Sequence, residues 1–329
     1  MATAARSHRR RTVLAAFSAG ALVVSGALVA TQLATQHQAL AAFETSPVGF
    51  ASMNGGTTGG SSSTVVTVTT ASALTSAISS STSQTVRVSG VISVSGMLSV
   101  ASNKTIIGVG SSSGITGGGL NLSGVKNVII RNLVFTNAGD DSINVQSSAT
   151  NIWIDHNDLS NGYDGLIDIK RGSDYITVSW NHLHDHDKSM LLGHSDDNSA
   201  EDLGHLRVTY VHNWFDGTNQ RHPRVRFANP VHVLNNYYND IGSYGVASTE
   251  NAGVYVERNY FENVDNPTVT QTGDSDSGNL KVLNNYKVNS GTEAVLNGAS
   301  VAAIPYSYTP EANSTVKATV TAGAGTGKI

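Results

Sequence analysis

Short strand-like segments recur along the chain, and each contains an asparagine followed by an apolar or aromatic pair. They read VIIRNLV, IWIDHNDL, ITVSWNHL, VTYVHNWF, VHVLNNYY, VYVERNYF and LKVLNNYK. Apolar and polar residues alternate for about six positions in each segment, which is typical of a half-buried strand. No helical periodicity accompanies them. The pattern therefore predicts a chain that is built mainly of short strands.

The aligned asparagines follow one another at a nearly constant spacing. They are Asn132, Asn157, Asn181, Asn213, Asn236, Asn259 and Asn285, and the gaps are 25, 24, 32, 23, 23 and 26 residues. Units of this length are too short for propeller blades, and one unit per coil of a parallel β-helix fits best. Stacked at one turn, each side-chain amide can bond to the asparagine of the next coil. The repeat thus predicts an all-β parallel solenoid with an asparagine ladder.

Both ends of such a solenoid need covering, because an open coil exposes strand edges. Residues 70–80 have helical spacing in Leu74 and Ile78, and we expect an N-terminal capping helix there. Residues 304–329 lack the repeat and are expected to pack along the side of the solenoid. The gap of 32 places about nine extra residues after Lys188, and such a long loop would form one wall of a cleft.

The N-terminal segment has the pattern of an export signal. Arginines at positions 6, 9, 10 and 11 precede an apolar stretch, and Ala-Leu-Ala at 39–41 is a small-residue cleavage site. The pair at 10 and 11 also loosely fits a twin-arginine signal, and an anchoring helix is the alternative. We expect residues 1–41 to be a secretion signal peptide and residues 42–329 to be a single secreted domain without a membrane span.

Composition narrows the possible functions of the mature chain. Four of the 20 lysines and arginines lie in the signal, so 16 remain against 24 acidic residues, which argues against nucleic-acid binding. The chain has no cysteine, so a secreted form must rely on a large core, on metal or on hydrogen-bond ladders. Its 33 glycines and many Ser, Thr, Asn and Val residues favour β-structure. A capped solenoid is expected to be a monomer.

Charged residues gather at one angular position of four successive coils. Their offsets from the asparagine of each coil are +9 for Asp141, +7 for Asp164, +11 for Asp168, +7 for Lys188, +8 for Arg221 and +13 for Arg226. Equal offsets stack in a parallel solenoid, and coils rise by about 4.8 Å, so this stripe would span on the order of 15 Å. That length matches a few sugar rings. The first two coils supply carboxylates, and the next two supply cations.

The carboxylates of the stripe favour a metal ion. Carboxylates from neighbouring coils repel one another unless a cation lies among them, and oxygen ligands without histidine or cysteine select Ca²⁺. We therefore expect Ca²⁺ at Asp141, Asp164 and Asp168, against the alternative of solvated surface acids. The histidines at 182, 184, 186, 194 and 205 show no clear ligand partner, which does not favour a second metal site. The aromatic residues after the asparagines are expected to stack internally.

Several motifs resemble those of the extracellular pectate lyases of polysaccharide lyase family 1. They are NIWIDHN at 151–157, DGLIDIKRGSDYITVSWN at 164–181, the R-x-P-x-x-R pattern at 221–226, ASMNGGTTGG at 51–60 and NKTIIGVG at 103–110. The likeness extends over residues 47–325. It implies a right-handed, single-stranded parallel β-helix that cleaves polygalacturonate, an acidic polysaccharide of plant cell walls, by Ca²⁺-assisted β-elimination to unsaturated oligogalacturonides.

The resemblance also implies a role for each residue of the stripe. Arg221 would be the Brønsted base, and Lys188 and Arg226 would bind substrate carboxylate. The three aspartates, Asp141, Asp164 and Asp168, would hold Ca²⁺. The resemblance, and not the spacing, selects position 221 over the neighbouring histidine and arginine at 222 and 224. Arginine holds its proton far above neutral pH, so nearby positive charges would have to favour its neutral form.

One position departs from the pattern of the family. Some members carry another metal ligand two residues before the first aspartate of the set. Gly139 occupies that position here, so either the ligand is absent or Asp140 partly replaces it.

Three other functions stay open. Pectin lyases act on methyl esters and lack the calcium carboxylates. A hydrolase of the polygalacturonase kind needs a carboxylate acid and a carboxylate base, which Asp140 and Asp141 could supply, but it leaves the cations unexplained. A non-catalytic polysaccharide-binding solenoid would be expected to repeat its charged residues on every coil.

Overall fold

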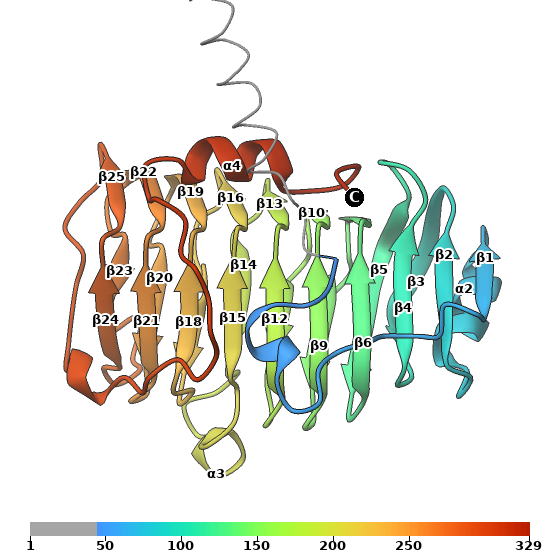
Figure 1. The fold of residues 1–329 in the computed structure, drawn as a ribbon, viewed down its shortest axis with the longest axis horizontal. Helices are drawn as coiled ribbons and strands as arrows, with labels where there is room; N and C mark the ends of the chain where they lie inside the picture. The colour runs from blue at the N-terminus through green and yellow to red at the C-terminus, as the bar shows by residue number, and fades with distance from the viewer. Residues whose placement is uncertain (1–44) are drawn as a thin grey trace, which may run out of the picture. The chain divides into compact units, whose positions relative to one another are not determined.

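The computed structural model describes residues 45–329, which wind into a solenoid of parallel strands (Figure 1). Three rows of strands run along it, which we call rows A, B and C, and a full coil supplies one strand to each row. The predicted parallel β-helix is confirmed. The signal peptide expected at 1–41 lies outside the described residues. Within residues 45–329, no helix is both long and apolar enough to cross a membrane.

Row A is the ten-stranded sheet. It contains β1 (Val65–Val68), β2 (Gln84–Val88), β4 (Lys104–Gly108), β6 (Lys126–Arg131), β9 (Thr150–Asp155), β12 (Asp174–Ser179), β15 (Val208–Val211), β18 (Val231–Leu234), β21 (Gly253–Glu257) and β24 (Asn279–Leu283).

Rows B and C are joined at one end by the long strand β5 (Gly114–Ser123), which pairs with β7 of row B and with β8 of row C, and with β3 (Val91–Ser99). Row B contains β7 (Val134–Thr136), β10 (Asp158–Ser160), β13 (His182–His184), β16 (Trp214–Asp216), β19 (Tyr237–Ile241), β22 (Tyr260–Val264) and β25 (Tyr286–Val288). Row C contains β8 (Ile143–Gln146), β11 (Gly165–Ile169), β14 (Lys188–Leu192), β17 (Arg224–Arg226), β20 (Val246–Thr249) and β23 (Thr268–Val269).

Within residues 45–329, few helices accompany the strands. They are α2 (Ala71–Ser79), α3 (Ser199–Asp202), α4 (Val316–Gly323) and the 3-10 helices η1 (Gly49–Ser52) and η2 (Gly298–Ser300).

Columns of apolar side chains fill the interior, because the parallel register places equivalent positions of successive coils above one another. One column of row A consists entirely of fully buried residues, namely Val128, Ile152, Ile176, Val208, Val231, Val254 and Leu280. In row B, the rings of Phe215, Tyr238 and Phe261 stack with centroids 4.9 and 4.5 Å apart. The expected internal stack is therefore made by one member of each aromatic pair, while the other member packs against α4.

Six asparagines form the ladder, which runs through buried turns between rows A and B. Each of the first five donates a side-chain N–H to the Oδ1 atom of the next over 2.9–3.1 Å, and the series is Asn157, Asn181, Asn213, Asn236, Asn259 and Asn285. The backbone N–H of each donor residue bonds to the same oxygen. The side-chain amide also donates to a strand carbonyl of row A. The polar groups of these turns are thus bonded from coil to coil.

The prediction that Asn132 begins the ladder is wrong by one residue. The strand register aligns Asn157 with Leu133, whose backbone N–H donates to Asn157 Oδ1 at 3.1 Å. Asn132 instead aligns with His156, and both residues have a positive φ, of 54° and 52°. Asparagine adopts this left-handed conformation more readily than most residues. The side-chain oxygen of Asn132 accepts a hydrogen bond from Gly327 N at 2.7 Å.

Both expected covers of the solenoid are present. The Oγ1 atom of Thr70 accepts a bond from Ala73 N and caps α2, which buries Leu74 and Ile78 in the main core and so covers the first coil. The C-terminal segment packs along the side of the solenoid, as expected. It also contains α4, which the sequence pattern had not indicated, and this helix lies over the outer aromatic side chains of row B (Figure 1).

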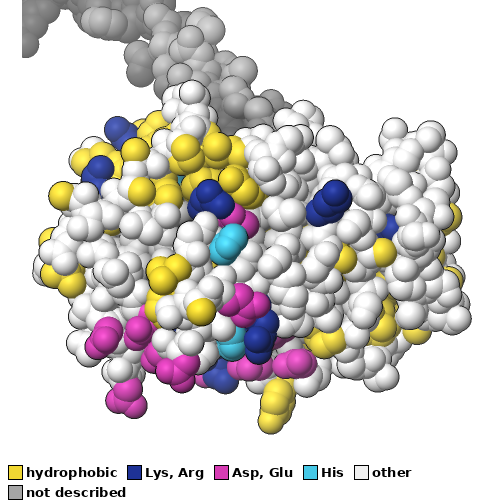
Figure 2. All heavy atoms as spheres, turned by 90° about the horizontal axis from the view of Figure 1, so that it is seen from below, with side chains coloured by type: hydrophobic (Ala, Val, Ile, Leu, Met, Phe, Trp, Pro, Cys, Tyr) yellow, Lys and Arg dark blue, Asp and Glu magenta, His cyan; other side chains and the backbone are white. Residues whose placement is uncertain are grey.

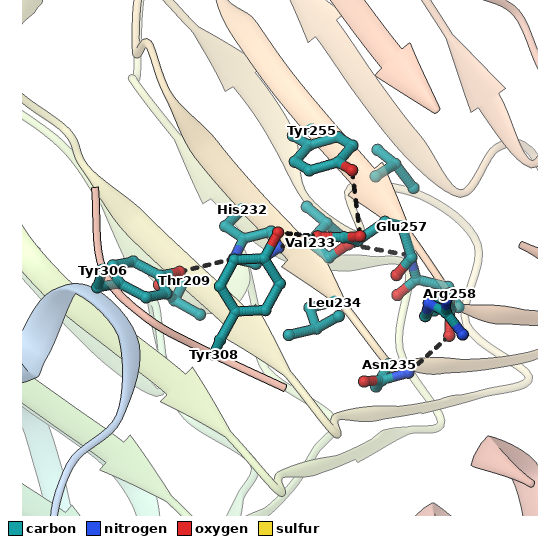
Figure 3. A network of polar contacts seen from close by, with 12 residues as sticks. Thr209, His232, Val233, Leu234, Asn235, Tyr255, Glu257, Arg258, Tyr306 and Tyr308 are labelled. Carbon is teal, nitrogen blue, oxygen red and sulfur yellow. Dashed lines mark hydrogen bonds and ion pairs between the residues drawn. The ribbon is translucent and has the colours of Figure 1, made fainter. Parts of the chain in front are cut away.

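A network of hydrogen bonds fastens the C-terminal segment to row A (Figure 3). Tyr306 Oη lies 2.7 Å from both Thr209 Oγ1 and His232 Nδ1. The buried carboxylate of Glu257 accepts a bond from Tyr308 Oη and lies 2.9 Å from His232 Nε2. Burial alone would raise the pKa of Glu257, but the hydrogen bonds from His232 and Tyr308 lower it. The segment is therefore held by a buried charge with satisfied partners.

The ladder makes a testable contribution to stability. Asn213→Ala would remove the oxygen that accepts both the backbone N–H and the side-chain N–H of the buried Asn181, so we expect a loss of about 2–5 kcal/mol in the free energy of unfolding. Asn285→Ala, at the less buried end of the ladder, should cost about 1 kcal/mol. Urea unfolding followed by circular dichroism measures both values. Equal losses for the two variants would contradict a ladder whose interior members carry the larger share.

Candidate active site

Row C carries the charged stripe. Strands β8, β11, β14 and β17 are consecutive neighbours in this row. Gly165 lies opposite Lys188, and Lys188 forms a bridge with Gln220, the residue before Arg221. With Leu133 as the ladder position of the first coil, Asp141 lies at +8 and not +9. The structure therefore places all six predicted residues along row C or in the turns that enter it.

Two carboxylates converge over Gly165. Asp141 Oδ1 accepts the backbone N–H of Gly165 at 2.9 Å. A Cβ atom at position 165 would lie 2.9 Å from Asp141 Oδ1 and 2.2 Å from Asp168 Oδ1, so any larger residue would push these side chains apart. The glycine thus leaves room for two acidic side chains at the same point of the surface.

Asp168 is the most constrained member of this group. Its side chain is 2 % exposed, and its Oδ1 atom has no hydrogen-bond partner among residues 45–329. Burial and the negative charge of Asp141 raise the pKa of Asp168. Burial likewise raises the pKa of Asp141, although Lys170 opposes it. Ionising both carboxylates is unfavourable unless a positive charge is close.

Close to these two carboxylates lies a set of oxygen atoms that could bind a hard cation such as Ca²⁺. Asp140, Asp141 and Asp164 each offer a carboxylate oxygen, and these oxygens all lie within 4.8 Å of one another. Asp140 thus belongs to this group of oxygens, whereas Asp168, one of the three predicted ligands, does not. With the unpaired oxygen of Asp168 beside them, the donors are all oxygens of two adjacent coils, as Ca²⁺ prefers. The residues present fit that ion.

The cationic side of the stripe begins with Lys188. Its Nζ atom lies 2.9 Å from Asp164 Oδ1, and this hydrogen bond lowers the pKa of Asp164. Lys170 is a further cation that the spacing argument missed, and its Nζ atom lies 3.3 Å from Asp141 Oδ2. Its place in DIKRG, two residues after Asp168, gave no signal, because it follows the end of β11. Figure 2 shows acidic side chains gathered with lysine, arginine and histidine along one edge of the face seen from below.

Within residues 45–329, the guanidinium of Arg221 makes no hydrogen bond or ion pair, whereas Arg224 and Arg226 each donate at least one hydrogen bond. The backbone of Arg221 has a φ of 66°, its carbonyl accepts Met190 N at 2.7 Å, and its buried Nε atom has no hydrogen-bond partner within the described part of the chain. His222 is fully buried with Nε2 2.7 Å from Thr218 Oγ1, so it faces the interior. Arg224 donates to Ser275 Oγ at 2.7 Å.

Arg226 is tied to the insertion that follows β14. Its Nε atom bonds to Asp196 Oδ1, and its Nη1 atom donates to Gly193 O at 2.9 Å. Ser275 Oγ bonds the same carboxylate at 2.8 Å. The inserted residues therefore lie beside row C, as the long gap indicated. The guanidinium of Arg226 is largely buried, and its side chain is 9 % exposed.

Comparison with known proteins relates the chain to one family. The sequence profile described as "Pectate lyase" matches residues 11–329. The chain is 40% identical over 276 residues to a probable pectate lyase B of Aspergillus terreus, covering 80% of this chain and 84% of that protein. It is 37% identical over 333 residues to a pectate trisaccharide-lyase of Bacillus licheniformis, covering 94% of this chain and 96% of that protein.

A solved structure has the same fold. The crystal structure of a pectate lyase from Bacillus sp. N165 in complex with trigalacturonate superposes with a TM-score of 0.79 at 33% sequence identity. The match covers 85% of this chain and 99% of that one.

The crowding of carboxylates over Gly165 predicts a trade between stability and function. In the presence of a chelator, Asp168→Asn should raise the thermal midpoint by a few degrees, about 2–4 °C per kcal/mol. Because burial and the charge of Asp141 raise the pKa of Asp168, folding near neutral pH requires this carboxyl either to take up a proton or to stay charged beside Asp141, and a neutral amide avoids both costs. Differential scanning calorimetry with chelator measures the effect, and Asp274→Asn, at an exposed carboxylate between β23 and β24, is the control. A lower midpoint for Asp168→Asn would show that the repulsion is already compensated.

Proposed function

The chain belongs to the pectate lyase family and is a lyase that acts on pectate, and we propose that row C performs a Ca²⁺-assisted β-elimination on polygalacturonate. The observation that carries the proposal is the polarised stripe, in which carboxylates of two coils adjoin cations of the next two. A hydrolase of the polygalacturonase kind gives no role to the cations, and a non-catalytic solenoid gives no role to a single charged region.

Asp141, Asp164 and Asp168 would hold the Ca²⁺ ion, with Asp140 beside them. When bound, Ca²⁺ would supply positive charge to the substrate carboxylate and stabilise the negative charge that develops on it. The fit rests on the unpaired oxygen of Asp168, the oxygens of the other three aspartates and the space that Gly165 leaves. Unesterified uronate is the matching substrate, since an ester would have no charge to neutralise.

Arg221 would take the proton from C5 of the uronate. The electron pair of the C5–H bond then forms the C4–C5 double bond, the C4–O bond breaks, and the released oxygen takes a proton from water. The guanidinium of Arg221 makes no hydrogen bond among the described residues. Arg224 donates from Nη2 to Ser275, although its Nε atom is also unpaired, and His222 faces the core. Burial and the charges of Arg226 and Arg221 lower the pKa of the neighbouring Arg224.

Lys188 and Arg226 would bind substrate carboxylate from the next coils. Lys188 is one-third exposed and reaches Asp164 at 2.9 Å, so a uronate could share its ammonium group with that carboxylate. Arg226 is fixed by Asp196 and Gly193, which orients its guanidinium but leaves little of it exposed. Its contribution would therefore come mainly from its charge and from the remaining N–H groups.

The wider setting of the enzyme follows from the sequence and the fold. We infer export by the segment at 1–41 and action as a monomer outside the cell on the acidic polysaccharide of plant cell walls. The basic and apolar pattern of that segment supports export, and the helix α2 over the first coil supports a monomer.

Calcium dependence is tested directly with polygalacturonate as substrate. A chelator should abolish formation of the ultraviolet-absorbing C4–C5 double bond, and added Ca²⁺ should restore it, while Mg²⁺ should serve poorly because it demands tighter octahedral geometry. Asp164→Ala should raise the Ca²⁺ concentration needed for half-maximal rate by about tenfold or more. Full activity in excess chelator would rule out the cation and favour a mechanism of the pectin-lyase kind.

The role of Arg221 is separable from binding. Arg221→Lys should lower kcat by about 10²–10⁴-fold with little change in KM, because lysine keeps the charge but cannot place a base at the same point. Arg224→Lys is the matched control and should retain most of the turnover, since Arg224 is bonded to Ser275. Initial rates at saturating Ca²⁺ give both constants. Near-normal kcat in Arg221→Lys would mean that another group takes the C5 proton.

A further inference from the structure

A second group of possible metal ligands lies on row B, away from the stripe on row C. It consists of Asp158 on β10 and of His182 and His184 on β13, which each offer a ligand atom within 4.8 Å of the others. Asp158 Oδ2 lies 3.0 Å from His182 Nδ1, and Asp158 Oδ1 lies 3.0 Å from His184 Nε2. The expectation that these histidines have no clear ligand partner is therefore wrong.

The strand geometry explains why the three side chains meet. Leu183 is fully buried, so the residues on either side of it point outward from β13. Asp158 is the register partner of His182 on the neighbouring strand and so shares that face. The sequence shows the two histidines as His-x-His, but the aspartate comes from the previous coil, 24 residues earlier, and only the register reveals it.

The outer nitrogen of each imidazole also faces a carboxylate. His182 Nε2 lies 3.5 Å from Asp216 Oδ2 on β16, and His184 Nδ1 lies 2.8 Å from Asp185 Oδ2. In a metal site, such a carboxylate accepts the N–H of the ring and directs the lone pair of the other nitrogen at the metal. Both rings are thus arranged with one nitrogen toward a carboxylate partner and the other toward Asp158.

The cluster is also sheltered from solvent. The indole of Trp214 stacks on His182 with ring centroids 4.2 Å apart, and the side chains of the three ligands are only 19–25% exposed. The C-terminal segment crosses above them just after α4, where a Cβ atom at Gly325 would lie 3.3 Å from His182 Cβ and 3.8 Å from Asp158 Oδ2 (Figure 1). Glycine at this position allows the close approach.

We propose that Asp158, His182 and His184 bind one divalent transition-metal ion of the Zn²⁺ type, at a site independent of the stripe on row C. Two imidazole nitrogens and one carboxylate oxygen form a donor set that suits Zn²⁺ rather than Ca²⁺. With bonds of about 2.0–2.2 Å, tetrahedral ligand atoms lie about 3.3–3.6 Å apart. In the structure each ring nitrogen lies 3.0 Å from a different oxygen of Asp158, Oδ2 for His182 and Oδ1 for His184. One ligand atom from each of the three residues already lies within 4.8 Å of the others, so side-chain adjustments suffice to bring them around one ion.

The competing state is an ion pair between imidazolium and carboxylate. The hydrogen bond to Asp158 raises the pKa of His184 to about 9, and the carboxylate of Asp185 acts in the same direction. Asp216 faces the cluster from β16, and the residue of the C-terminal segment above it, Gly325, carries no charge. A bound metal ion would replace the proton shared between the imidazole rings and Asp158. It would also link the coil of Asn157 to the coil of Asn181 beneath the C-terminal segment.

The test uses the whole secreted protein with saturating Ca²⁺, so that the oxygen ligands of row C are already occupied. Isothermal titration with ZnCl₂ at a pH of about 8.5 should show one equivalent of binding, and CoCl₂ should give the visible absorption of a tetrahedral ion. His184→Gln and Asp158→Asn should each weaken Zn²⁺ binding by about tenfold or more. His205→Gln, which changes a half-exposed histidine of the insertion, is the matched control and should bind as the wild type does.

Two further measurements distinguish a metal site from a structural ion pair. Ni²⁺ should quench the emission of Trp214, and Trp214→Phe should remove that quenching while calorimetry still shows Zn²⁺ binding. The rate on polygalacturonate should stay unchanged in His184→Gln, because this residue lies outside row C. The proposal is overturned if no saturable binding occurs, or if His184→Gln and Asp158→Asn, shown to be folded by circular dichroism, bind Zn²⁺ as tightly as the wild type. In either case the cluster is an ion pair only.

Discussion

The hydrogen bond from one asparagine side chain to the next is the interaction on which the rest of the structure depends. A parallel solenoid has no hairpin turn to set its register, so each coil could slide on its neighbour without some further constraint. The buried ladder from Asn157 to Asn285 removes that freedom, because a shift by one residue would leave several buried amides unpaired. Residues that follow their ladder asparagine by the same number of positions therefore lie above one another on the surface of successive coils.

Because the register is fixed, charged residues that recur at a regular spacing in the sequence come together in one site. The cations at Lys188 and Arg221 and the carboxylates at Asp141 and Asp164 come from four coils, yet they share one side of row C. Repulsion among carboxylates is concentrated over Gly165, where Asp168 is almost fully buried and its Oδ1 atom has no hydrogen-bond partner in the described part of the chain. The protein holds this unfavourable arrangement because its columns of buried aliphatic side chains are continuous on the inner face of the same strands.

The sequence predicted what depends on the repeat, and missed what depends on contacts between specific coils. The solenoid, the ladder, the capping helix and the charged stripe all follow from periodicity. Asn132 was misplaced because an asparagine also suits the left-handed residue just before the ladder position. The bond of Asp196 to Arg226 spans 30 residues, and the place of Lys170 beside Asp141 spans 29, with no motif to mark either. Helix α4 has too few apolar residues to stand out, and it forms because the aromatic side chains of row B cover it.

The return of the C-terminal segment along row B has a consequence for how the molecule is made. Gly327 bonds to Asn132 across 195 residues, and Thr326 bonds to Ser111 across 215. At about 5–20 residues per second, a ribosome needs roughly 10–40 s to travel from one end of the first contact to the other. Contacts of such long range form slowly, and the C-terminal segment can pack against the early coils only after nearly all of the chain has been made. The contacts of Gly327 and Thr326 are therefore among the last that the folding chain can form.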